Sequence, residues 1–253
     1  MTASTMKSKL LNKSVISISI FAFWLGIWYA LAYVVDSVLL LPTPHETLFA
    51  LFDLATTFEF YKVVFFTLIR VAFGLILGIS CGIIFAILCY RFEILKTLFN
   101  PIISVIRATP VASFIVLLWV LVSGSALAVV VAFLMVMPIV WQNTLDGFNS
   151  IPKELIEVAD IYELSLRRRF SVLILPILSD YIFPAVITSV GLAWKSEIAA
   201  EIIAYTKDSV GMHINDAKSL MLTPTVFAWT AIIVVMSIAL ELLTRKLLRR
   251  TRK

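Results

Sequence analysis

The chain has 253 residues, of which 61% are hydrophobic and 15% are charged, whereas soluble domains are roughly 45–50% apolar and about 25% charged. The mean hydropathy of +1.01 excludes a soluble globular domain, because one core of this size could not bury so much apolar surface. Lipid is therefore the expected solvent for most of the chain.

Six hydrophobic segments predict six membrane-spanning helices. In chain order they cover residues 15–35, 63–90, 108–122, 126–141, 181–205 and 225–243. About 20 apolar residues are needed to cross the hydrocarbon core, so the third and fourth segments are short, and we expect them to tilt or to be sheltered by neighbours. Helices are expected because backbone groups in lipid must be hydrogen-bonded within their own segment. The predicted fold class is all-α integral membrane, with a segment 1–14, one transmembrane domain at 15–245 and a basic tail at 246–253.

The first hydrophobic segment is also similar to the core of a secretory signal. Lysines precede it, and Ala30-Leu31-Ala32 is similar to a cleavage site. Its apolar run is longer than that of a normal signal, so we expect an uncleaved anchor.

The basic residues predict the orientation in the membrane, because cytoplasmic loops carry an excess of lysine and arginine. With a cytoplasmic N-terminus and six spans, the opposite face receives only Lys62, Lys207 and Lys218, and Arg70 and Lys195 lie within spans. The remaining basic residues fall on the cytoplasmic side: Lys7, Lys9, Lys13, Arg91, Lys96, Arg107, Lys153, Arg167, Arg168, Arg169, Arg245, Lys246, Arg249, Arg250, Arg252 and Lys253. We therefore predict that both termini are cytoplasmic, and that the net charge of +5 reflects membrane topology and contact with anionic lipid rather than nucleic-acid binding.

Ionisable residues inside spans indicate a functional site, because an idle charge is costly in lipid. Four residues inside spans and Arg107, at the start of the third span, are candidates for a translocation path or gate; the four are Arg70, Lys195, Glu197 and Glu201. Glu197 and Glu201 share a helix face, and Arg70 is one candidate partner for them. A structural ion pair that holds helices in register is an equally good interpretation.

Three glycines at every fourth position, Gly74, Gly78 and Gly82, lie on one face of the second span. Small residues at this spacing let two membrane helices approach closely. We favour packing within the chain over a subunit interface.

Neither metal nor nucleotide binding is expected on this chain. His45 and His213 are far apart in sequence and have no cysteine or acidic cluster around them. The sequence also lacks a phosphate-binding loop that ends in Gly-Lys-Ser/Thr. Any ATP that drives the protein would bind another chain.

A polar segment at about residues 143–178 interrupts this apolar chain. Acidic residues recur every third position from Glu154 to Glu163, and Leu155, Ala159 and Leu166 follow helical spacing, which predicts an amphipathic helix. Ser165 is placed to cap a second short helix. A helix–break–helix of this kind can lodge in a groove of a soluble partner.

The segment resembles the cytoplasmic EAA loop of binding-protein-dependent ABC transporter permeases, in which Glu-Ala-Ala is followed by Gly and later by Ile-x-Leu-Pro. Here Glu157-Val158-Ala159 stands for the first part, Glu163 for the Gly and Leu173-Ile174-Leu175-Pro176 for the last. Glu163 in the left-handed conformation of that Gly would cost about 1 kcal/mol, or the break is built differently. Three further stretches resemble the nitrate/sulfonate/taurine-type branch: Leu41-Pro42-Thr43-Pro44, Arg107-Ala108-Thr109-Pro110 and Gly191-Leu192-Ala193-Trp194.

The resemblance implies a type I importer permease in a bacterial inner membrane, and a chain that is not itself an enzyme. Its partners would be two copies of a cytoplasmic ATPase that binds ATP and Mg, an extracytoplasmic substrate-binding protein, and a second permease subunit. We expect that subunit to be a copy of this chain, although a heterodimer is open. Nitrate, alkanesulfonates, taurine and thiamine precursors are the solutes of this branch, and nothing in the sequence selects among them.

The ATPase would dock on the loop, with Glu157 and Ala159 at the centre of the contact. The coupling residues are then Glu157, Val158, Ala159, Asp160, Tyr162, Glu163, Leu164, Ser165 and Leu166. An alternative function is a self-sufficient, proton-coupled secondary transporter that uses Glu197 or Glu201.

Overall fold

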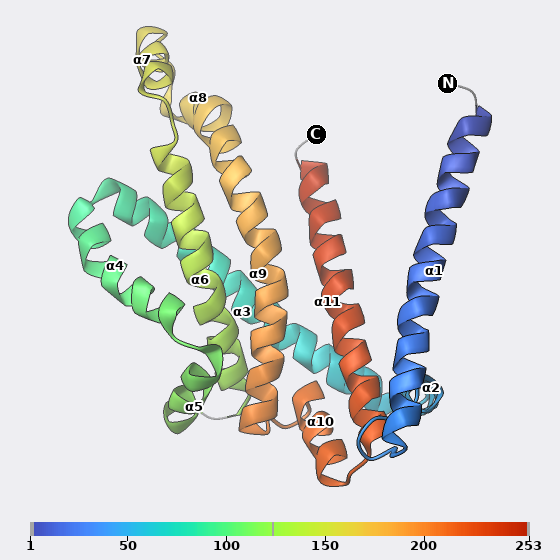
Figure 1. Ribbon diagram of the computed structural model, residues 1–253. Helices are drawn as coiled ribbons and strands as arrows, with labels where there is room; N and C mark the ends of the chain where they lie inside the picture. Colours follow the sequence, from blue (N-terminus) through green and yellow to red (C-terminus); the bar gives the residue numbers. More distant parts are fainter. Residues whose placement is uncertain (1–2, 123, 252–253) are drawn as a thin grey trace. The chain divides into compact units, whose positions relative to one another are not determined.

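The computed structural model describes residues 3–122 and 124–251, and side chains at positions 15, 16, 18–122 and 124–249. All regular elements in this part are helical (Figure 1). Six of the side chains used to predict the orientation lie outside the described ones: Lys7, Lys9, Lys13, Arg250, Arg252 and Lys253.

The helices follow one another with short connections. They are α1 (Ala3–Val35), α2 (Pro44–Ala55), α3 (Phe58–Arg91), α4 (Glu93–Ala108), α5 (Val111–Leu121), α6 (Ser125–Asn149), α7 (Lys153–Ile161), α8 (Leu166–Arg169), the π-helical turn η1 (Phe170–Ile174), α9 (Leu175–Ala204), α10 (Val210–Ser219) and α11 (Thr223–Thr251).

In the described part, five helical stretches are long and apolar enough to cross a membrane, and a bent pair of helices can make a sixth span. The five lie at Ile18–Val35, Phe58–Arg91, Ser125–Asn149, Leu166–Ala204 and Thr223–Arg249. The bent pair is α4 with α5, whose axes differ by 109°. These helices confirm the all-α membrane fold.

The third and fourth predicted segments need correction. Segment 108–122 is not a span of its own, because α5 has 11 residues and a bend separates it from α4. Pro110 explains the bend, since proline disfavours a helical residue before it and cannot donate a backbone hydrogen bond. Segment 126–141 was too short, because α6 continues for 25 residues, through polar positions that hydropathy alone would exclude.

The chain divides into two compact units. The first comprises Met1–Phe60 and Asp216–Ile232, and the second Tyr61–Asn215 and Ile233–Lys253. In the first unit, the indole nitrogen of Trp28 donates a hydrogen bond to the carbonyl of Pro42 at 3.0 Å, just before α2. Thr43 and Glu46 form a reciprocal capping box at the start of α2, which accounts for the Pro-Thr-Pro sequence there.

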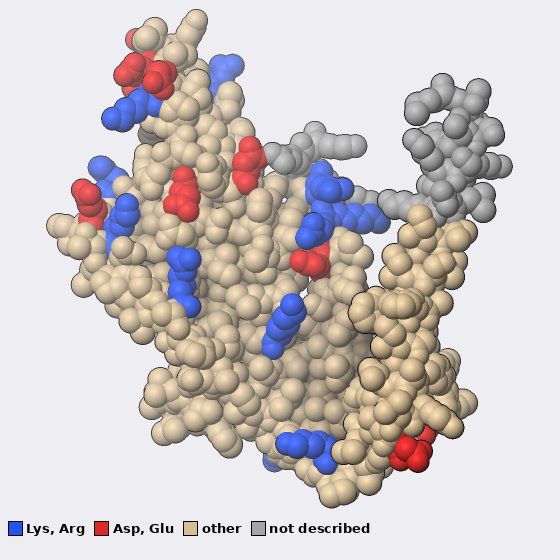
Figure 2. All heavy atoms as spheres, viewed as in Figure 1, with Lys and Arg blue, Asp and Glu red and all other residues tan. Residues whose placement is uncertain are grey.

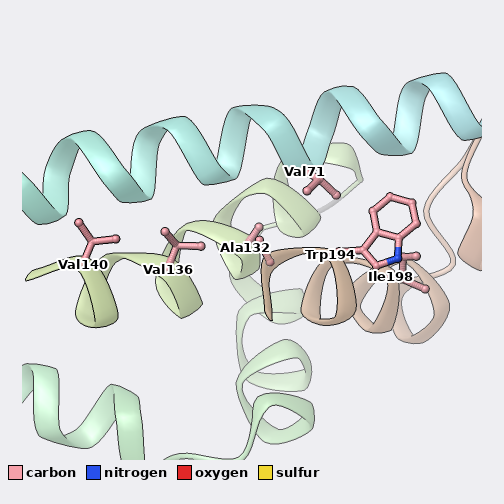
Figure 3. Packing of buried hydrophobic residues seen from close by; sticks show 7 residues of the cluster. Val71, Ala132, Val136, Val140, Trp194 and Ile198 are labelled. Atoms are coloured by element: carbon pink, nitrogen blue, oxygen red, sulfur yellow. The ribbon is translucent and has the colours of Figure 1, made fainter. Parts of the chain in front are cut away.

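The core of the second unit lies where α3, α6 and α9 meet. Its buried side chains are Val71, Ala132, Val136, Val140, Ala193, Trp194 and Ile198 (Figure 3). The indole nitrogen of Trp194 donates to the carbonyl of Ile233 on α11 at 3.0 Å. A buried indole is thus paired with a backbone acceptor, as burial requires.

The glycine face of α3 lies against α6. A Cβ atom at Gly74 would lie 2.6 Å from the Cβ of Ala132, and one at Gly78 would lie 2.7 Å from that of Val136. At Gly82 it would lie 2.9 Å from the carbonyl oxygen of Met137. The two helices therefore pack backbone to backbone at these positions, and no larger residue fits.

Candidate functional sites

The α7–α8 hairpin projects beyond the ends of α6 and α9 (Figure 1). Helix α7 ends in a Schellman motif, in which the N–H of Leu164 donates to the carbonyl of Ala159 and the N–H of Glu163 to that of Asp160, both at 3.0 Å. Glu163 has a φ of +47°, the left-handed conformation that glycine adopts most easily. At the break, Glu163 therefore adopts the left-handed backbone conformation that the family's glycine would adopt.

The second half of the hairpin is short. Ser165 occupies the N-cap position of α8, but its side chain makes no capping hydrogen bond. Instead, Arg169 Nη1 contacts Asp160 Oδ1 at 2.7 Å, which ties α8 back to α7. In Figure 2 acidic and basic side chains lie together over this end of the molecule.

The side chains of the hairpin differ in their exposure. Ala159 is only 3% exposed, because it lies on the inner face of α7 where the chain returns toward Leu164. Its side chain is therefore covered within the hairpin itself. The most exposed apolar side chains of the hairpin are Ile161 at 78%, Tyr162 at 75% and Leu166 at 84%. We call these three residues the hairpin tip.

Within the second unit, a buried polar cluster surrounds the carboxylate of Glu201. Its Oε1 lies 2.8 Å from Arg70 Nη1 and accepts a hydrogen bond of 2.9 Å from the hydroxyl of Thr67. Its Oε2 accepts one of 3.2 Å from the backbone N–H of Gly211. Glu201 thereby links α9 to α3 and to the start of α10.

Arg70 extends the cluster to the loop between α9 and α10. Its Nη2 donates to the carbonyl of Lys207 at 3.0 Å and to that of Asp208 at 3.1 Å. Arg70 is 8% exposed and Glu201 is fully buried. A buried charge pair whose own carboxylate and guanidinium groups are hydrogen-bonded fits the structural interpretation of these two residues.

Two members of this cluster, Thr67 and Gly211, were not predicted from the sequence. Thr67 lies one helical turn before Arg70 on the same face of α3, a signal that the i, i+3 spacing could have supplied. Gly211 gave no local signal. A Cβ atom there would lie 2.4 Å from the Cβ of Glu201, so only glycine allows α10 to start beside the carboxylate.

Glu197 lies one turn before Glu201 on α9 and is fully buried. Neither of its carboxylate oxygens has a hydrogen-bond partner within the described residues. The two glutamates thus share a helix face, as their spacing predicts, but only Glu201 is engaged by the cluster.

The loop beside the cluster carries a second ion pair, at its surface. Lys62 Nζ lies 2.8 Å from Asp208 Oδ1. The hydrogen bond from Lys62, followed by its positive charge, lowers the pKa of Asp208 below the usual value. This pair continues the link between α3 and the α9–α10 loop.

The remaining two candidate residues lie apart from the cluster. Arg107 lines a cavity beside the break between α4 and α5. Lys195 is exposed on α9. The five predicted path residues therefore form one buried pair, one isolated carboxyl group and two accessible cations. Within the described part no group of three or more histidine, cysteine or acidic side chains is placed to hold a metal ion.

The family model for the "binding-protein-dependent transport system inner membrane component" matches residues 74–253. A Bacillus subtilis (strain 168) permease named for aliphatic sulfonate transport, SsuC, is 27% identical over 232 residues, covering 89% of this chain and 83% of that protein. The nitrate import permease protein NrtB of Synechococcus elongatus is 31% identical over 119 residues, 47% of this chain and 42% of that protein.

The crystal structure of an amino acid ABC transporter is similar in fold. It aligns with a TM-score of 0.60 at 17% identity, over 76% of this chain and 92% of that chain. At this identity the similarity shows a shared fold.

Proposed function

Because the chain belongs to the family of binding-protein-dependent inner membrane transport components, we propose that it is the membrane subunit of an ATP-driven importer for a small anionic or polar solute. It is a multi-pass bacterial membrane transport protein and not an enzyme. Sulfonate-type and nitrate-type solutes are proposed from the relatives named above.

The proposed importer contains two permease copies, two ATPase copies that bind ATP and Mg, and one extracytoplasmic binding protein. The proposed orientation places both termini and the α7–α8 hairpin in the cytoplasm, on the side with most basic residues. Closure of the ATPases would move the two hairpins together and switch the paired permeases between inward- and outward-facing states.

The observation that carries the coupling role is the exposed apolar tip of the hairpin. Ile161, Tyr162 and Leu166 stand on a tightly closed scaffold of Schellman hydrogen bonds and the Asp160–Arg169 ion pair. Apolar side chains on a charged, water-facing loop indicate a protein contact. A rigid knob can transmit the motion of a partner, whereas scattered surface charges cannot.

Reconstitution tests the proposal. The chain is co-expressed with ATPase and binding-protein candidates from the same genome, and uptake of labelled ethanesulfonate and nitrate is measured in proteoliposomes. We expect ATP-dependent uptake of at least one of the two anions. Uptake without ATPase would contradict the importer.

The coupling surface is tested separately by co-purification. We expect Tyr162→Ser combined with Leu166→Ser to reduce the amount of ATPase recovered with the permease. The matched control is Leu40→Ser, which removes a side chain that is 73% exposed outside the hairpin. Equal recovery for both variants would place the contact elsewhere.

A further inference from the structure

A cavity of about 310 Å³ lies beside the break between α4 and α5. Its walls come from four helices and include Arg107, Thr109, Leu134, Pro138 and Leu192. The volume is at the lower end of the range for small-molecule sites. Apart from Arg107, no charged side chain lines it.

The backbone between α4 and α5 is irregular. Helix α4 ends at Ala108 and α5 begins at Val111, with the 109° bend between them. At membrane depth such a break is tolerated only where it is buried in protein or lines a water-filled cavity. The cavity beside Thr109 supplies that setting.

Arg107 is accessible from the cavity and has no ion-pair or hydrogen-bond partner among the described residues. Its guanidinium is always charged, and its planar fork suits oxygens of an anion. Arg70 shows the contrast, because all its neighbours satisfy it. Within the described residues, Arg70 is therefore paired with a carboxylate and backbone carbonyls, whereas Arg107 has no such partner.

Lys195 is a second accessible cation near this wall. It lies on α9 one turn beyond Leu192, which lines the cavity, and residues three apart share a helix side. It likewise has no partner among the described side chains. Cations without a protein partner in apolar helices are rare, and they mark substrate or ion pathways.

We propose that the cavity beside Arg107 binds the charged head of the transported solute, a singly charged oxyanion such as a sulfonate or nitrate group. The proposal rests on the importer function above and assigns its charge selectivity. Arg107 supplies two N–H donors to the oxygens, the apolar walls accommodate an uncharged tail, and Lys195 adds positive potential on the next turn of α9.

The complete importer in proteoliposomes tests this, with labelled ethanesulfonate and nitrate as probes. Arg107→Gln is expected to lower anion uptake by about tenfold or more, the loss expected when a charge-assisted hydrogen bond is removed. Arg107→Lys is expected to retain a larger share of uptake. The control, Lys246→Gln, removes one exposed charge from α11 and is expected to leave uptake unchanged.

Two further readouts separate the outcomes. Vesicles of phosphatidylcholine alone and with phosphatidylglycerol distinguish the solute from lipid headgroups, because a loss only with phosphatidylglycerol would mean that Arg107 binds lipid, and would overturn the proposal. The amount of assembled transporter recovered by size-exclusion chromatography is compared between wild type and Arg107→Gln, which checks folding and assembly. Unaltered uptake by Arg107→Gln overturns this inference alone, whereas wild-type uptake of neither anion overturns the solute class of the proposed function.

Discussion

Arg70 on α3 and Glu201 on α9 are 131 positions apart in the sequence, yet their side chains meet at 2.8 Å in the buried interior. The pair is joined by the hydroxyl of Thr67 and the N–H of Gly211. It therefore fixes the relative positions of α3, α9 and the start of α10. We expect its removal to lower the stability of the fold, apart from any effect on transport.

Removing one partner of this pair is the first prediction. Glu201→Gln or Arg70→Gln should destabilise the protein by about 3–5 kcal/mol, because each leaves an uncompensated buried charge. The measurement is denaturant unfolding in detergent, with the double variant completing a cycle. The double variant should lose less than the sum of the two singles, and simple additivity would show that the two groups do not interact.

Glu197 should behave differently from Glu201, although the two are one turn apart. Its oxygens have no hydrogen-bond partner among the described residues, so Glu197→Gln keeps the shape and breaks no hydrogen bond seen there. We expect a change in unfolding free energy within about 1 kcal/mol. Unfolding is measured beside Glu201→Gln as the matched control, and an equal loss in both variants would contradict the distinction.

Glu163 offers a gain of stability. Because its φ of +47° is strained for a residue with a Cβ atom, Glu163→Gly should stabilise the hairpin by up to about 1 kcal/mol. Glu163→Ala should not, since alanine keeps the Cβ atom. Hydrogen exchange of the α7 amides measures the difference, and faster exchange in the glycine variant would disprove it.

The start of α2 should weaken in acid. Hydrogen bonds from the side chain and backbone of Thr43 lower the pKa of Glu46 below its usual value. A carboxyl group with a lowered folded-state pKa stabilises the fold above its unfolded pKa, and the contribution is lost as pH falls through the folded value. The protection factors of the α2 amides, which correct for the slower intrinsic exchange in acid, should therefore fall as the pH is lowered.

The control for this pH dependence is Thr43→Ala. It removes the side-chain half of the capping box, so α2 in this variant should exchange faster at neutral pH and change less on acidification. An acid response as large as that of the wild type would show that another group is responsible.

In the α7–α8 hairpin, the sequence pattern predicts only the features that depend on neighbouring residues. The polar interruption, its amphipathic spacing and the break at Glu163 all follow from residues within about one or two helical turns of each other. The burial of Ala159 does not, because it depends on the path of the chain after the break. Sequence spacing placed Ala159 on a helix face but could not decide which face the returning chain covers.

The bend at Pro110 is a second feature that the sequence predicts only in part. Hydropathy identified an apolar segment there, and proline predicts a break, but neither gives the direction in which α5 leaves α4. That direction, together with α6 and α9, decides that Arg107 faces a cavity. Arg107 was a candidate from its position alone, and its surroundings came from the fold.

By itself the sequence determined the solvent of the chain, the helical class, most of the spans and the polar loop, because hydropathy and helical period act over neighbouring residues. Only the tertiary structure decided that Arg70 pairs with Glu201, that Glu197 has no hydrogen-bond partner among the described residues and that position 211 requires glycine. These depend on atoms from distant segments meeting within hydrogen-bond range, and that distance is set by how α3, α9 and α10 pack.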